Sequence, residues 1–164
     1  MPHTIDHRCN GCSAFARQCP TGAISGDKRE RYRVDPLLCI DCNVCGIICA
    51  LDAVSDARGL PVARIPRDRR PRPVVRADHC NGCGLCADFC PFDCLAVVGP
   101  RFDGVVALVA PGACVSCNEC ARACEKGAIT LRPLDLRRYD PAAETARLAG
   151  YLLQAGGRAC GHEP

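Results

Sequence analysis

Four short cysteine runs constrain the fold of this chain more than any other feature of its sequence. Three of them follow the spacing C-x2-C-x2-C-x3-C and begin at Cys39, Cys80 and Cys114. The first run begins at Cys9 and keeps the spacing, but it has Phe15 in place of its third cysteine. Thiols two residues apart lie on one tight loop, whereas the last thiol of the run has turned away. The chain must therefore fold around whatever these thiols bind.

The composition indicates a fold held together by cross-links or by bound metal. The chain has 164 residues, of which 17 are Cys, four are Phe, three are Tyr and none is Trp. This length suits one domain or two small ones. So few large side chains cannot build an ordinary core. Disulfides or metal must supply part of the stability.

A disulfide framework is one alternative, and we expect that it does not apply. The N-terminal stretch MPHTIDHRCNGC has no apolar signal segment. The sequence has no apolar run of about 18 residues either, so no membrane span is predicted. We therefore predict a cytoplasmic protein, whose cysteines stay reduced or bind metal.

Structural zinc is the other alternative. Zinc is usually held in a closed tetrahedron by two pairs of ligands. Three thiols in one loop and a fourth from a distant run suit a cubane iron–sulfur cluster better. The spacing therefore indicates iron–sulfur sites.

The runs form a tandem repeat, in which the first matches the third and the second matches the fourth. Repetition of this kind indicates duplicated structural units. Short strands are expected around the cysteine loops, in TIDH, RYRVD and PVVRAD before them and in TGAIS and GAITLR after them. We predict a first unit over residues 1–59, a linker over 60–76, a second unit over 77–132 and a tail over 133–164.

The predicted linker and tail have distinct compositions. Residues 60–76 contain six Arg and four Pro, which favours an extended connection. The basic residues are either solvated or dock an acidic surface. In the tail, Asp140 followed by Pro141 predicts the start of a helix. This helix is expected to dock on its own domain, or alternatively on a partner subunit.

Each half of the chain resembles the bacterial-type dicluster 2[4Fe-4S] ferredoxin, and the whole resembles a tandemly duplicated polyferredoxin. The resemblance rests on the cysteine runs and covers about residues 3–132. It implies an α+β fold of two tandem ferredoxin-like dicluster units with short strands and helices, followed by the C-terminal helical tail. It also implies that each cluster takes three thiols from one run and one from the paired run. The implied ligand sets are Cys80, Cys83, Cys86 and Cys124; Cys114, Cys117, Cys120 and Cys90; and Cys39, Cys42, Cys45 and Cys19.

The fourth site has only Cys9, Cys12 and Cys49, because Phe15 stands where its remaining ligand is expected. We expect a [3Fe-4S] cluster there, or an incompletely ligated [4Fe-4S] cluster. Water, His7 or a spare thiol, Cys94 or Cys160, could take the open corner, and an empty site is a further alternative. The predicted cofactors are three [4Fe-4S] clusters and this fourth one.

The predicted function is the transfer of single electrons between a donor and a separate oxidoreductase, as a subunit or shuttle that is not itself an enzyme. His3, His7 and His79 are interpreted as surface or hydrogen-bonding residues. A redox or oxygen sensor that uses the three-Cys site is the alternative, and an enzyme using an open iron is a third possibility. The expected partners are redox proteins and not nucleic acid. Four bound clusters would change the formal charge from +3 to roughly −5.

Overall fold

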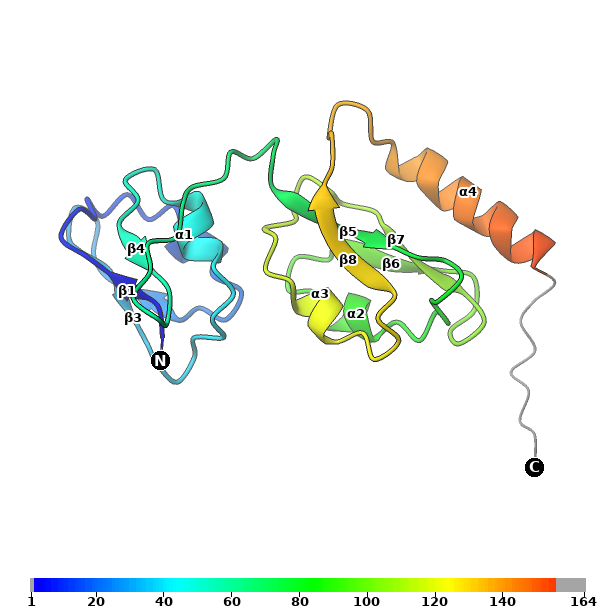
Figure 1. Cartoon of the computed structure of the whole chain (residues 1–164), viewed down its shortest axis with the longest axis horizontal. Helices are drawn as coiled ribbons and strands as arrows, with labels where there is room; N and C mark the ends of the chain where they lie inside the picture. Colours follow the sequence, from blue (N-terminus) through cyan, green and yellow to red (C-terminus); the bar gives the residue numbers. More distant parts are fainter. Residues whose placement is uncertain (1, 156–164) are drawn as a thin grey trace. The chain divides into compact units, whose positions relative to one another are not determined.

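The computed structural model describes residues 2–155, and the chain divides into two compact units between Arg70 and Pro71. Each unit combines short antiparallel strands with short helices that begin in the cysteine loops (Figure 1). The mixed architecture of small strands and helices therefore agrees with the sequence-based prediction.

The first unit contains two sheets of two strands each. β1 pairs with β4 and β2 pairs with β3, both antiparallel. Each of these strands has only two residues, because the cysteine loops take up most of the chain between them. The elements of this unit are β1 (Thr4–Ile5), η1 (Ala16–Gln18), β2 (Ile24–Ser25), β3 (Arg33–Val34), α1 (Val44–Ile48) and β4 (Val54–Ser55).

The second unit repeats this pairing with longer strands and adds a helix. β5 pairs with β8 in the manner of β1 and β4, and β6 pairs with β7 in the manner of β2 and β3. A turn in the sequence GPRFDG joins the apolar runs that form β6 and β7. The elements are β5 (Pro71–Val75), α2 (Leu85–Asp88), β6 (Leu95–Val98), β7 (Val105–Leu108), α3 (Glu119–Arg122), β8 (Ile129–Pro133) and α4 (Pro141–Gln154).

The segment that we expected to be a linker, residues 60–76, is hydrogen-bonded at both of its ends. The Val62 N–H donates to the carbonyl of Val54 at 2.9 Å, and the Ile65 N–H donates to the carbonyl of Ile47 at 3.0 Å. Its C-terminal part is strand β5 of the second unit. The segment therefore has hydrogen-bonded backbone at each end.

The C-terminal helix α4 begins where the sequence predicts. The Asp140 side chain accepts a hydrogen bond from the Ala142 N–H at 2.9 Å, and Pro141 is the first helical residue. Leu148 is 1 % exposed and packs with Val105 and Ala107 of β7. Figure 1 shows α4 beside the β6–β7 sheet. Gly156 and Gly157, which the sequence predicts to end this helix, lie outside the described residues.

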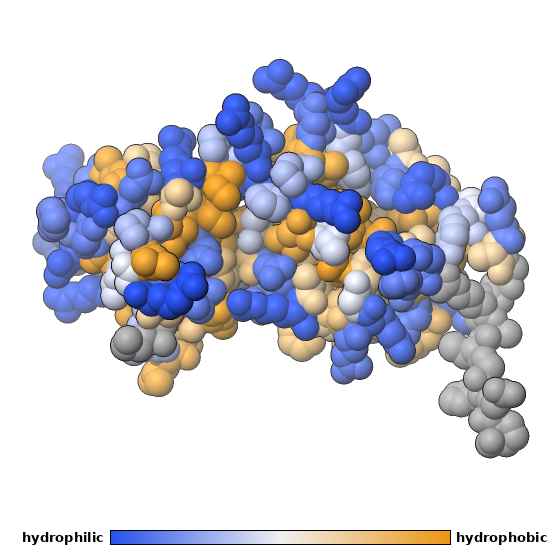
Figure 2. Space-filling view, viewed as in Figure 1, coloured by the Kyte–Doolittle hydropathy of each residue, from blue (hydrophilic) through white to orange (hydrophobic). Residues whose placement is uncertain are grey.

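Both units leave apolar side chains at the surface among charged ones (Figure 2). The buried cores are correspondingly small, and cysteines form a large part of each. Among the helices of residues 2–155, none is long and apolar enough to cross a membrane. Exposed large apolar residues include Leu37, Phe89 and Phe102.

Candidate metal centres

The four cysteine loops share one backbone conformation. In each loop, the residue before the second cysteine position and the residue after it have positive φ, which side-chain-bearing residues rarely adopt. The residue three positions after the last cysteine of each run does the same. Left-handed residues in such loops turn successive N–H groups toward one concave face that suits an anion. These positions are Gly11, Asp41, Gly82 and Ser116; Ser13, Asn43, Gly84 and Asn118; and Gly22, Asp52, Asp93 and Gly127.

One pocket of the first unit is lined by Cys19, Cys39, Cys42 and Cys45. Helix α1 begins at Val44, two residues after Cys42, and carries Cys45, which is 9 % exposed. Burial raises the pKa of the Cys45 thiol to about 12, and the neighbouring thiols contribute. A thiol at this position therefore keeps its proton until a bound cation replaces it.

His3 lies beside this pocket and is 2 % exposed. Its Nε2 lies 2.7 Å from the Asn43 Oδ1, and its Nδ1 lies 2.9 Å from the Asp41 Oδ1. The same Nδ1 is 3.8 Å from the Cys39 Sγ. The imidazole is thus held against the cysteine loop, so His3 is a buried hydrogen-bonding residue and not a surface one.

The second unit has two pockets of the same kind. One is lined by Cys80, Cys83, Cys86 and Cys124. The other is lined by Cys90, Cys114, Cys117 and Cys120, together with Cys94. Burial raises the pKa of the Cys86 and Cys120 thiols to about 12, as it does for the corresponding thiol of the first unit. Four thiols around one pocket are the donor set that a [4Fe-4S] cluster requires.

Backbone N–H groups point at the last cysteine of three runs. The donor in each case is the residue four positions later, at 3.4 Å for Ala53 to Cys49, 3.4 Å for Cys94 to Cys90 and 3.3 Å for Ala128 to Cys124. Hydrogen bonds to sulfur stabilise a ligating thiolate and tune the potential of the group that it holds.

Arg72 is a feature of the second unit that sequence reasoning missed, and Cys94, named above as a spare thiol, lines the same pocket as Cys114. Arg72 is completely buried and donates from Nε to the Pro111 carbonyl at 2.9 Å. A hydrogen bond from the Cys94 thiol lowers the pKa of the Cys114 thiol to about 6, and the N–H of Ser116 and the positive charge of Arg72 add to this effect. In the sequence, Arg72 is one of several linker arginines, and no local pattern marks it as buried.

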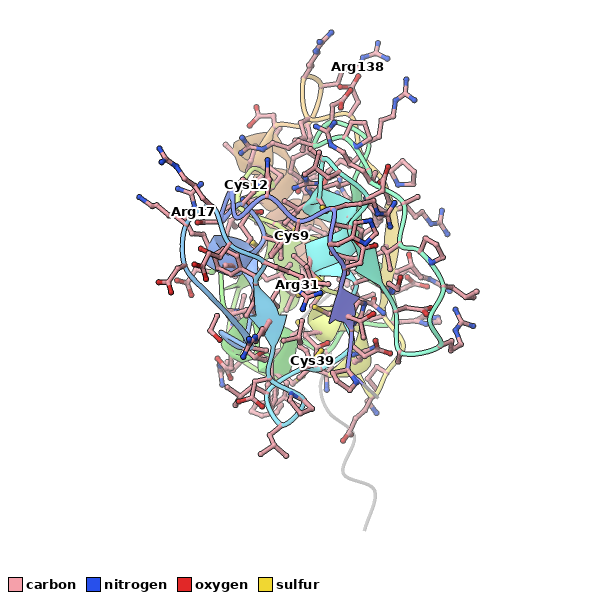
Figure 3. All side chains as sticks on the ribbon, turned by 90° about the vertical axis from the view of Figure 1, so that its left-hand side faces the viewer. Cys9, Cys12, Arg17, Arg31, Cys39 and Arg138 are labelled. Carbon is pink, nitrogen blue, oxygen red and sulfur yellow. The ribbon has the colours of Figure 1, made fainter. Side chains whose placement is uncertain are left out.

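The site of the first run is built differently. Cys49 is 4 % exposed and Cys12 is exposed. Phe15 is 2 % exposed and belongs to the same core as Cys49, against which Cys9 packs. Figure 3 shows Cys9 and Cys12 well separated from Cys39 on this face. Three thiols with a buried aromatic ring at the third position do not make up the four-thiol donor set of the other sites.

The candidate replacement ligands for this site lie in different parts of the chain. His7 is exposed. Cys94 is 2 % exposed in the core of the second unit, where it lines the pocket of Cys114. Cys160 lies outside the described residues. Within residues 2–155, no three His, Cys, Asp or Glu side chains converge on a point that would hold a single metal ion.

Comparisons with known proteins agree with this donor chemistry. Two family models, each described as a 4Fe-4S binding domain, match residues 73–96 and residues 111–127. The chain is also 38 % identical over 53 residues to a protein of Rhizobium leguminosarum bv. trifolii named "Ferredoxin-like protein in nif region". The matched part is 29 % of this chain and 81 % of that relative.

Proposed function

Because this chain belongs to the ferredoxin-type iron–sulfur proteins, we propose that it is a polyferredoxin that carries single electrons between a donor and a separate oxidoreductase. The observation that carries the proposal is the grouping of cysteines around three pockets, with four around each of two pockets and five, including Cys94, around the third. A [4Fe-4S] cluster in each pocket would supply a centre that accepts and releases one electron.

Each proposed site takes its ligands from two runs of the sequence. Three thiols come from one loop and the fourth ends the paired run, so a cluster would tie together segments that are distant in the chain. The left-handed residues of each loop favour this arrangement, because they orient backbone N–H groups toward a negatively charged group. The proposed sets are Cys19, Cys39, Cys42 and Cys45; Cys80, Cys83, Cys86 and Cys124; and Cys90, Cys114, Cys117 and Cys120.

The surroundings of the pockets suit electron transfer. The inner thiols are buried, and His3 and Arg72 bring ring and guanidinium nitrogens to the walls of two sites. Such groups favour the more negative, reduced state of a nearby redox centre. Three clusters would also change the formal charge from +3 to roughly −3, so the loaded protein suits a partner with a basic surface. We propose that this partner is a catalytic oxidoreductase subunit.

The test is anaerobic purification followed by iron and acid-labile sulfide analysis and a reductive titration monitored by EPR. We expect about 12 iron atoms per chain and several reversible one-electron steps. The variant Cys117→Ala is expected to remove about four of these irons. A matched control is Ser13→Ala, which alters a loop residue without removing a thiol. Reconstituted protein without iron or without reversible reduction would contradict the proposal.

A further inference from the structure

Two residues of the first cysteine loop differ from their counterparts in the second unit. Phe15 has the place of Cys86, because the two runs have the same spacing. Ser13 has the place of Gly84, and both have positive φ. The two loops therefore have the same backbone course but different side chains at the third ligand position.

The strand register identifies a third difference on the opposite wall of the site. Ile24 lies five residues after Cys19, and Leu95 lies five residues after Cys90, so the two residues correspond. Each pairs with a residue of the next strand, Ile24 with Val34 and Leu95 with Leu108. Two residues before Val34 is Tyr32, and two residues before Leu108 is Val106. Tyr32 therefore has the place of Val106, which lines the pocket of Cys80 and Cys86 in the second unit.

Phe15 and Tyr32 contact each other inside the first unit. Their ring centroids are 5.8 Å apart, and the ring planes are at 86°, an edge-to-face geometry that aromatic pairs favour. Phe15 is 2 % exposed and Tyr32 is 6 % exposed. Both rings are larger than the side chains that they replace, and both are buried, so the added volume lies inside the site.

Two neighbouring residues accommodate this pair. The Ser13 Oγ is 2.6 Å from the Tyr32 hydroxyl, so the half-buried end of the phenol has a hydrogen-bond partner. Gly26 stands opposite Tyr32 across the hairpin, and a Cβ there would lie 3.1 Å from the Tyr32 Cγ. The counterpart of Gly26 in the second unit is Val97, which pairs with Val106. Four residues around the Phe15–Tyr32 contact therefore differ from their counterparts in the second unit, namely Ser13, Phe15, Gly26 and Tyr32.

We propose that Phe15 and Tyr32 form an aromatic plug that fills the first site, so that no cluster binds there. The chain would then hold three clusters, and Cys9, Cys12 and Cys49 would be thiols. This inference rests on the proposed function, because it treats the other three sites as loaded. It replaces the sequence-based expectation of a three-iron cluster, and it removes the site that an oxygen sensor would use.

The test compares Cys12 with Cys83, the matching cysteine of the second unit. The full-length holoprotein is treated anaerobically with iodoacetamide without denaturant, and alkylation of each cysteine is measured by mass spectrometry. We expect rapid alkylation of exposed Cys12 and at least about tenfold slower alkylation of Cys83, because a metal-bound thiolate is not free to react. Iron content is measured on the same sample.

The outcomes separate the plug from the proposed function. Labelled Cys12, protected Cys83 and about 12 irons per chain support the plug. Protection of both cysteines with about 15 or more irons, or a three-iron EPR signal from the oxidised protein, overturns the plug and leaves the proposed function standing. Alkylation of both cysteines in protein that contains no iron contradicts the proposed function instead.

Matched variants test the plug by a second route. Cys12→Ala is expected to leave the iron content unchanged, whereas Cys83→Ala is expected to lower it by about four atoms. Phe15→Cys alone is expected to add no iron, because Tyr32 still fills the site. Phe15→Cys combined with Tyr32→Val restores both side chains of the second unit and is expected to add about four irons. A full extra cluster in Phe15→Cys alone would overturn the role assigned to Tyr32.

Discussion

Arg72, which is completely buried, donates a hydrogen bond from Nη1 to the Ser116 Oγ at 3.2 Å. Ser116 is the second of the two residues between the first two cysteines of the fourth run. The matching residue of the second run is Asp41, whose Oδ1 lies 2.9 Å from the Nδ1 of the buried His3. In both units a buried nitrogen-bearing side chain therefore contacts the same position of a cysteine loop.

Replacement of Arg72 is expected to affect one centre more than the others. In Arg72→Met, the positive charge beside Cys114 is lost, so the reduced state of the adjacent centre is less favoured. We expect its midpoint potential to fall by about 30–100 mV in an EPR-monitored titration, within the range over which charge and hydrogen bonds tune such centres. The control is Arg132→Met, which removes an exposed arginine from the paired strand. Equal shifts in both variants would contradict a local effect.

His3 is expected to have a similar influence in the first unit. His3→Leu removes the partners of Asn43 and Asp41 beside Cys39. Loss of such buried hydrogen bonds is expected to destabilise the first unit by about 1–3 kcal/mol. Thermal unfolding of the holoprotein measures this, with the exposed His7→Leu as the control. An unchanged midpoint of unfolding in His3→Leu would show that these contacts contribute little.

Glycine is expected to be needed at position 46 of α1, because the Val62 side chain of the segment after β4 packs against it. A Cβ at this position would overlap the side chain of Val62, whose N–H bonds to Val54. Gly46→Ala should therefore destabilise the first unit by about 1–3 kcal/mol, although Ala normally favours a helix over Gly. The double variant Gly46→Ala, Val62→Ala should recover much of the loss. Chemical unfolding would measure both, and a more stable single variant would contradict the contact.

Removal of metal is expected to unfold both units. The strands of the first unit have two residues each, and cysteines make up much of both cores, so little else fixes the loops. Binding of metal to such thiols is coupled to folding. A strong iron chelator with a reductant should abolish the native far-ultraviolet circular dichroism. Native dichroism in protein shown to be free of iron would refute this expectation.

The Tyr139 hydroxyl is expected to lower the free energy of unfolding at high pH. Burial raises the pKa of its hydroxyl to about 12, and the hydroxyl donates to the carbonyl of Leu108 at 2.8 Å. Because the pKa of the Tyr139 hydroxyl in the folded protein is raised above its ordinary value of 10.0, the contribution is complete below about pH 10 and is lost as the pH rises toward 12. An absorbance titration should show one late-titrating tyrosine that is absent in Tyr139→Phe but present in Tyr151→Phe. A late step in Tyr139→Phe would assign it to another residue.

The sequence alone determined the features that depend on residues close together in the chain. The intervals between cysteines decide which thiols share a loop, and Asp140 followed by Pro141 decides where α4 begins, because both effects operate within one turn of the chain. The family prediction rested on those intervals, and the comparisons confirm it. The short strands likewise lie in the stretches beside the cysteine loops where the sequence predicts them.

Tertiary structure alone decided the features that depend on contacts between distant segments. The composition of the Arg-rich stretch predicts either a solvated strip or one that docks an acidic surface, whereas β5 pairs with β8 and carries Arg72 into the core beside Ser116. Phe15 reads only as a missing ligand until the hairpin register places Tyr32 against its ring. No spacing in the sequence links these partners, because a hairpin or a sheet can join segments of any separation. The cysteine pattern therefore predicts which thiols share a loop, whereas only the packed structure brings the Phe15 and Tyr32 rings into contact.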